Sequence, residues 1–291
     1  EDLKTAGTLG GKCYGNGTCN GGLICLGDKC IASASDGGGD DATAGDKDAT
    51  AKDAATDSGP FTVANVPGLV FWVYGSSGLD YTADGGVTGW EDYSGHDNSA
   101  ISVRSPGPAY VPSTINGLPG IQVSPSTTDL EIPINDWTSS PLLVEVVEVV
   151  TSASSPGIIF GSIEPPGSTG TPAFQLTAAS GPVEFEGSSF DLVAPASFPV
   201  NDGLPHVIGI RHSWVDNGSG GTGSSIEVRY DGALANRQTF PEKLVFSDTT
   251  CTTHMGVQVD GIISEVIAVK GSTSDASVAA IESYLKTKYD L

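Results

Sequence analysis

The feature that most limits how this chain can fold is a series of short apolar runs, separated by turn residues, that begins after Pro60. Runs rich in Val, Ile, Thr and Phe alternate with Gly, Pro, Asn and Asp, and no spacing typical of a β-α-β unit occurs. In residues 226–230 the apolar residues share one face of a strand and the charged residues the other. The pattern predicts an all-β domain with antiparallel sheets over residues 60–291.

Eleven of these runs are predicted to be strands, and one segment near the end of the chain is predicted to be a helix. The strands are residues 69–74, 121–123, 130–134, 142–150, 158–160, 174–177, 207–212, 226–230, 240–246, 256–259 and 262–269. Ser274 can cap the helix, Asp275 lies in its first turn, and Val278, Ile281 and Leu285 form an apolar stripe.

The charge of the chain excludes one class of partner. Thirty-five acidic residues against 13 basic ones give a net charge of −22, so nucleic acid binding, which requires clustered Lys and Arg, is not expected. No apolar stretch approaches the roughly 20 residues that a membrane helix needs, so membrane insertion is not expected either. The chain starts with Glu1-Asp2, which favours removal of a targeting segment and a secreted, extracellular or cell-surface location.

Residues 1–35 are predicted to form a small module held by disulfides. Cys13, Cys19, Cys25 and Cys30 are separated by polar turns too short to bury a core, so covalent links must replace burial. Of the three possible pairings we favour the interlaced Cys13–Cys25 and Cys19–Cys30. Zinc is a weaker alternative, because no Cys-x-x-Cys pair and no nearby His is present.

Residues 36–59 are predicted to be an acidic linker of Ala, Asp, Thr and Gly. They contain no aromatic residue and cannot bury enough apolar area to offset the entropy of ordering. Thr43 and Thr50, in two Asp-Ala-Thr repeats, are candidates for modification.

Four segments of residues 66–291 resemble, in order, the concanavalin-A-like lectin/glucanase (laminin-G-like jelly-roll) domains of secreted bacterial proteins. They are GLVFWVYGSSGLDYTADGGVTGWEDYSG, INGLPGIQV, LPHVIGIRHSW with SIEVRYDGAL, and DGIISEVIAVKGSTSDASVAAIESYLKTKYDL. The resemblance implies a jelly-roll sandwich of two antiparallel sheets with a C-terminal helix. The Cys-rich module resembles, more loosely, short knottin-like repeats of bacterial surface proteins. This fold hosts lectins, glucanases, adhesion modules and spacers, so it does not fix the function.

The glucanase branch of the fold needs two carboxylates facing each other across a sugar. Glu145 and Glu148 are three residues apart and fall on opposite faces of a regular strand, whereas Glu184 and Glu186 share a face but lack a third carboxylate at the right spacing. We interpret both pairs as solvent-facing and expect no enzyme activity. No Gly-x-Ser-x-Gly elbow is present, and Cys251 is interpreted as a buried strand thiol, with an intermolecular disulfide as the alternative.

Calcium is the cofactor that the sequence can best accommodate. Asp80 and Asp84 flank a glycine-containing loop, and Asp92 and Asp97 follow shortly. Calcium prefers six to eight oxygen ligands, which such loops supply, although an Asp-rich surface turn explains the same pattern.

Sugar binding would need an exposed aromatic platform beside amide or carboxylate groups. Trp137, with Asn135 and Asp136, lies in a polar stretch and is the first candidate; Trp214 with Asn217 is the second. Trp72 and Trp90 are predicted to be core residues. We therefore expect a non-catalytic extracellular adhesion or carbohydrate-binding protein whose sandwich loops contact a glycan or surface polymer. The alternatives are a structural subunit of an extracellular filament, which would bind copies of itself, and a glycoside hydrolase.

Overall fold

The computed structural model describes residues 23–26, 29–32, 61–75, 77–125, 129–134, 136–137, 141–163, 174–178, 183–187, 190–244, 246–247 and 252–291. The chain divides into two compact units, Glu1–Pro60 and Phe61–Leu291. In the first unit, β1 (Leu23–Leu26) pairs antiparallel with β2 (Lys29–Ala32), and Cys25 lies opposite Cys30. Cys13, Cys19, Thr43, Thr50 and Cys251 lie outside the described residues, so the disulfide pairing and the modification stay predictions.

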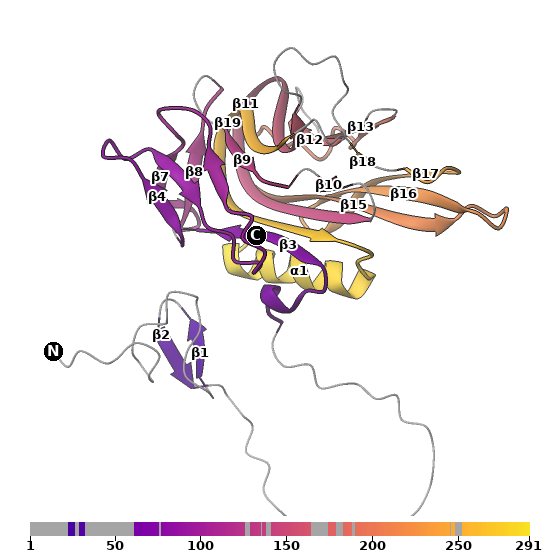
Figure 1. Cartoon of the computed structure of the whole chain (residues 1–291), viewed down its shortest axis with the longest axis horizontal. Coiled ribbons are helices and arrows are strands. Elements are labelled where there is room, and N and C mark those ends of the chain that lie inside the picture. Colours follow the sequence, from indigo (N-terminus) through magenta and orange to yellow (C-terminus); the bar gives the residue numbers. More distant parts are fainter. Residues whose placement is uncertain are drawn as a thin grey trace, which may run out of the picture. The chain divides into compact units, whose positions relative to one another are not determined.

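The second unit is an all-β sandwich with a C-terminal helix, which confirms the predicted fold class (Figure 1). Two long strands, β11 (Leu142–Ile163) and β19 (Thr252–Lys270), pair with each other and take part in both sheets. The register of this pair shifts at three places between Val147 and Ile158. Such bulges bend strands, and here the two strands pass from one sheet to the other.

The first sheet, called the helix-side sheet, has the strand order β3-β19-β11-β15-β16-β17. β8 and the hairpin partner β7 continue it along the same edge of β19 as β3. The bounds are β3 (Leu69–Tyr74), β7 (Ala109–Ile115), β8 (Leu118–Val123), β15 (Pro205–Asp216), β16 (Thr222–Tyr230) and β17 (Ala233–Phe240). Asp231 and Gly232 join β16 to β17 with φ values of 49° and 79°, a turn for which Asp-Gly is favoured.

The second sheet has the order β14-β13-β12-β11-β19-β9-β6-β5-β4. Its further strands are β4 (Leu79–Tyr81), β5 (Val87–Trp90), β6 (Ala100–Ser102), β9 (Leu130–Ile132), β12 (Phe174–Ala178), β13 (Val183–Gly187) and β14 (Phe190–Val193). A short pair, β10 (Asp136–Trp137) and β18 (Phe246–Ser247), and the 3-10 turn η1 (Val63–Asn65) complete the described elements of this unit.

The main hydrophobic core lies between the two sheets. Val144, Ile208 and Val228 contribute from the helix-side sheet, and Phe160 and Phe174 contribute from the second sheet. Burying a side chain of this size stabilises the fold by roughly 1.5–3 kcal/mol. Trp90 is fully buried in this core as predicted, whereas Trp72 is only partly buried and donates its indole N–H to Glu265 Oε1 at 2.8 Å.

A second core lies between the helix-side sheet and helix α1 (Asp275–Tyr289), which covers that sheet's outer face (Figure 1). The predicted cap is confirmed, because the Ser277 backbone N–H donates to Ser274 Oγ at 3.1 Å. The predicted stripe of Val278, Ile281 and Leu285 is buried in this second core. No helix in the described part of the chain is long and apolar enough to cross a membrane.

Two predictions about this unit are wrong. Residues 240–246 are not one strand: β17 ends at Phe240, Pro241 follows without an N–H for a strand ladder, and Phe246 belongs to β18. Glu145 and Glu148 are not solvent-facing, since each is only 1% exposed. The prediction failed because the helix and the neighbouring strands cover β11 from both sides, which its own pattern does not reveal. The short strands β4, β5 and β6 were also missed.

Candidate functional site

Trp137 is not the exposed platform that the sequence suggests, because it is 2% exposed and belongs to the main core. Its ring packs edge-on against Phe160 and Phe174, and its indole N–H donates to Thr253 Oγ1 at 3.0 Å. Pairing of β10 with β18 carries this tryptophan inward. Asn135 lies outside the described residues, and only the backbone of Asp136 is described.

Trp214 and Asn217 already have partners in their own turn and in the segment that follows β17. Lys243 Nζ lies 3.7 Å from the centre of the Trp214 ring, a cation–π contact. Asn217 Oδ1 accepts from the backbone N–H groups of Ser219 and Gly221, and its Nδ2 donates to the Pro241 carbonyl at 3.1 Å. Asn217 therefore shapes the turn.

The four predicted calcium ligands do not come together in one cluster. Asp92 is buried and accepts from the Trp72, Ser94 and Asn98 backbone N–H groups and the Ser94 hydroxyl. Asp84 accepts a hydrogen bond from Thr82, which lowers the pKa of Asp84. Asp80 and Asp97 are exposed. Among the described residues, no group of three acidic, His or Cys side chains is placed to hold a metal ion.

Instead, one row of register partners runs straight across the second sheet. Direct partners in antiparallel strands share a face. The row consists of Asp80, Gly89, Ile101, Glu131, His254, Gly161, Gln175, Glu186 and Asp191. The adjacent row contains Leu130, Met255, Phe160, Leu176, Phe185 and Leu192, all buried in the core. The polar row therefore lies on the outer face of the second sheet.

Exposure divides this row into two halves. Asp80 is exposed, Ile101 is 52% exposed and Glu131 is partly exposed, whereas His254 and Gln175 are 7% and 6% exposed. We call the accessible half, with Asp80, Gly89, Ile101 and Glu131, the β4–β9 face.

A groove of about 470 Å³ lies at the β4 end of this face. Two glycines leave room for the carboxylate side chains here, because a Cβ at Gly89 would lie 3.3 Å from Asp80 Oδ2 and one at Gly78 would meet the Glu91 side chain. Tyr93 hydrogen-bonds Glu91, and burial together with the Glu91 charge raises the pKa of Tyr93 to about 12. The lining residues are Gly78, Leu79, Asp80, Gly89, Trp90, Glu91, Ser99, Ala100 and Ile101.

A hydrogen-bonded relay lies at the inner end of the β4–β9 face. His254 Nδ1 lies 3.0 Å from Asp129 Oδ2, and Arg104 Nε donates to Asp129 Oδ1 at 2.9 Å. Burial alone would raise the pKa of Asp129, but hydrogen bonds from His254 and Arg104 lower it. The other ring nitrogen of His254, Nε2, lies 2.6 Å from the Thr252 hydroxyl. The relay fixes both side chains beside the accessible face.

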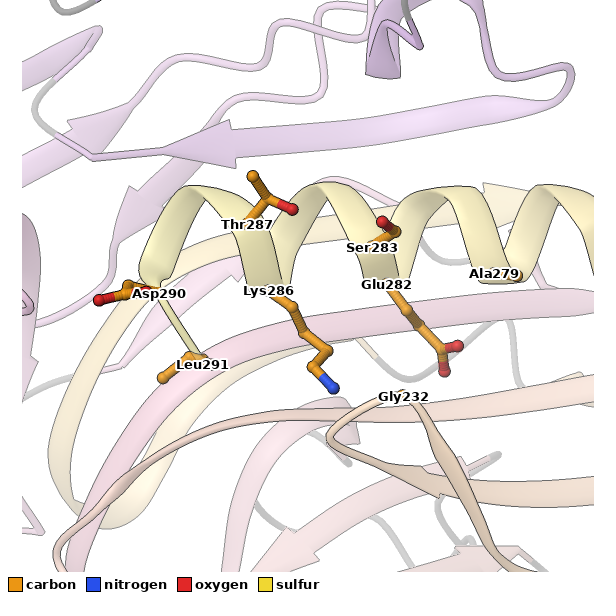
Figure 2. Close-up of a pocket in the computed structure, with 8 residues that line it drawn as sticks. All are labelled: Gly232, Ala279, Glu282, Ser283, Lys286, Thr287, Asp290 and Leu291. Carbon is orange, nitrogen blue, oxygen red and sulfur yellow. The ribbon is translucent and has the colours of Figure 1, made fainter.

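A second groove, of about 610 Å³, lies between α1 and the β16–β17 turn. Figure 2 shows Glu282 and Lys286 pointing from the helix toward Gly232. Both side chains already have partners: Glu282 accepts from Arg229, and Lys286 Nζ donates to the Asp231 carbonyl at 2.9 Å. The charged groups of this second groove thus hold α1 in place against the sheet.

Buried ionisable groups elsewhere serve the structure. Burial raises the pKa of Glu148 well above its usual range, and the charges of Asp202 and Asp231 raise it further. His206 lies between those two aspartates, at 3.1 Å and 3.0 Å; burial lowers its pKa, but the aspartates raise it overall. Glu148 lies opposite His206 in the register of β11 and β15.

Sequence reasoning singled out Asp80 on the β4–β9 face but missed Gly89, Glu91, Ile101 and Glu131. The signal in β5 and β6 is weak, since these strands have four and three residues and β5 contains a glycine. The sequence did not single out His254 as a site residue. Its partner Asp129 is distant in sequence, and no local pattern joins the two.

No family model matches the sequence, and no curated protein matches it. Solved structures match by fold. The binding domain of Paraclostridial Mosquitocidal Protein 1 has a TM-score of 0.56 and 10% identity, over 77% of this chain and 53% of that one. Domain 4 of AbnA, a GH43 extracellular arabinanase from Geobacillus stearothermophilus, in complex with arabinotriose, has a TM-score of 0.52 and 14% identity, over 74% of this chain and 98% of that one. At these identities the likeness establishes the β-sandwich fold alone.

Proposed function

We propose that this chain is a non-catalytic extracellular protein that binds carbohydrate on the β4–β9 face of its second sheet. The observation that carries the proposal is the row of register partners across that sheet. Carboxylates, an imidazole relay and an exposed Ile101 lie along it, and Gly89 leaves a groove for the ligand. Sugar rings present hydroxyl groups at their edges and C–H groups on their faces, so a site needs both polar and apolar contacts.

Two further features support the proposal. Tyr81, the residue after Asp80, is 46% exposed and packs edge-on against Tyr110, so an accessible aromatic ring lies on β4, the strand that borders the groove. The domain of the arabinanase that matches this chain over 98% of its own length is in complex with arabinotriose. A groove of this volume can take a ligand of two or three sugar units, since small-molecule sites are typically about 300–1,000 Å³.

The test is binding of the full chain to a panel of insoluble and soluble polysaccharides, measured by depletion and by calorimetry. Gly89→Leu fills the groove, and we expect it to lower affinity at least about tenfold, the loss of roughly 1.4 kcal/mol of contacts. The matched control is Ala279→Leu. Ala279 is exposed on α1 and lines the second groove, between α1 and the β16–β17 turn, so this change should leave binding unchanged. Equal effects of the two variants, or no binding to any polysaccharide, would contradict the proposal.

Two additions to the same experiment address calcium and catalysis. Affinity is measured with added calcium and with a chelator, and a drop with the chelator would indicate a calcium-dependent site. Each bound polymer is then incubated with the chain and assayed for new reducing ends. We expect none, whereas their steady release would favour the glycoside hydrolase alternative.

A further inference from the structure

The positive charges of the second unit are gathered on one side of it. Of its eight Lys and Arg residues, five lie between the helix-side sheet and α1 or on that helix, namely Arg211, Arg229, Arg237, Lys286 and Lys288. Lys243 lies over Trp214, and Lys270 ends β19 in the helix-side sheet. Arg104 is the remaining cation, and Asp129 neutralises it.

The β4–β9 face, in contrast, carries exposed negative charges. Asp80 and Glu91 are exposed at the groove, and Glu131 lies on the neighbouring β9. In the described part of the chain, none of these three carboxylates forms an ion pair with Lys or Arg. Asp80 Oδ2 lies over Gly89 and the Glu91 side chain lies over Gly78, so both side chains occupy the space that a larger residue at these glycines would take. Both residues also line the groove.

From this separation of charge we infer that the ligand of the β4–β9 face is a glycan that carries protonated amines, such as a polymer of de-N-acetylated hexosamine. The inference rests on the proposed function and names the class of glycan. A polymer of uronic or sialic acids would meet like charges at Asp80, Glu91 and Glu131, which disfavours binding. A neutral glycan would leave all three carboxylates without a counter-charge. An amine on successive sugars would pair with them through charge-assisted hydrogen bonds.

Each exposed ammonium–carboxylate contact is weak in water, roughly 0.2–1 kcal/mol. A repeating polymer forms several at once, and contacts within one bound chain add up through a high effective concentration. The affinity should therefore depend on the fraction of free amines and fall as salt is added, because salt screens exposed charges.

The experiment compares binding of the full chain to chitosans of increasing acetylation, to chitin fragments, to neutral arabinan and to polygalacturonate, at pH 6 and two salt concentrations. We expect affinity to rise about tenfold or more from the fully acetylated to the mostly free-amine polymer. The double variant Asp80→Asn with Glu91→Gln should lose most of that preference, so that its affinities for the free-amine and the fully acetylated polymer become similar.

A cationic polymer also attracts any acidic protein, so the control removes the same charge elsewhere. Asp216→Asn with Glu242→Gln changes two exposed carboxylates outside the β4–β9 face. If this control loses as much affinity as the groove variant, general attraction explains the binding and the inference fails. Binding of neutral or acidic glycans with no preference for amines would also overturn it, although the proposed function would stand. Failure to bind any glycan would overturn both.

Discussion

Polar residues have different surroundings on the two outer faces of the sandwich. On the helix-side sheet, α1 covers the charges: Arg229 donates two hydrogen bonds to the buried Glu282, and Glu265 accepts from Trp72, Tyr284 and Lys288. On the second sheet, Asp80 and Glu91 are exposed and Glu131 is partly exposed. Paired charges under a helix serve stability, and unpaired ones beside a groove are available to a ligand.

The largest effect should come from breaking the covered charge pair. Glu282→Ala leaves the Arg229 guanidinium partly buried without its main partner, and we expect a loss of about 3–5 kcal/mol in the free energy of unfolding. Urea denaturation measures this. Ser283→Ala, the next residue on α1, is the control and should change stability by less than about 0.5 kcal/mol. Equal losses of stability in Glu282→Ala and Ser283→Ala would mean that the Arg229–Glu282 pair does not hold α1.

The buried carboxyls make the covered face sensitive to pH. Burial raises the pKa of Glu145 and of Glu148 well above the usual range; the Glu282 charge adds to the shift at Glu145 and Arg229 opposes it. A raised folded-state pKa gives stability that is fully present below the unfolded pKa and is lost as the pH rises through the folded pKa. The loss is at most about 1.4 kcal/mol per pH unit for each proton.

The measurement is the free energy of unfolding between pH 4 and pH 9. Glu145→Gln and Glu148→Gln should lose less stability than the unchanged chain as the pH rises, since an amide has no proton to release. His206 acts in the same direction, because its pKa is raised too. Glu242→Gln changes an exposed carboxylate and should follow the unchanged chain. If the free energy of unfolding changes with pH in the same way in all variants, the pH dependence does not come from Glu145 and Glu148.

Two glycines allow a direct comparison of the faces. A Cβ at Gly209, on the covered face, would lie 2.2 Å from Glu145 Oε2, whereas a Cβ at Gly89 would lie 3.3 Å from the exposed Asp80 side chain. Gly209→Ala should therefore destabilise the chain by about 1–3 kcal/mol through overpacking. Gly89→Ala should be neutral or slightly stabilising, since glycine weakens a strand. Thermal unfolding of both variants tests this prediction. A larger loss of stability in Gly89→Ala than in Gly209→Ala would contradict it.

The smallest effect concerns the start of α1. Ser274→Ala removes the hydroxyl that accepts from the Ser277 N–H, and we expect a loss of about 1 kcal/mol. Ser274→Asp keeps an acceptor at the cap and should retain stability. If both variants unfold alike, the cap contributes little and the helix is held by packing alone.

The sequence by itself determined the local elements of this protein. Apolar alternation and turn residues predicted antiparallel strands, and the pattern near the end of the chain predicted the helix with its Ser274 cap, because such signals involve residues close in the chain. Only the tertiary structure decided which residues share a site. Asp80, Glu131 and His254 are neighbours through the register of strands far apart in sequence, and bulges in β11 and β19 set that register. Burial of Trp137 and Glu145 depended in the same way on what packs against them, which no local pattern specifies.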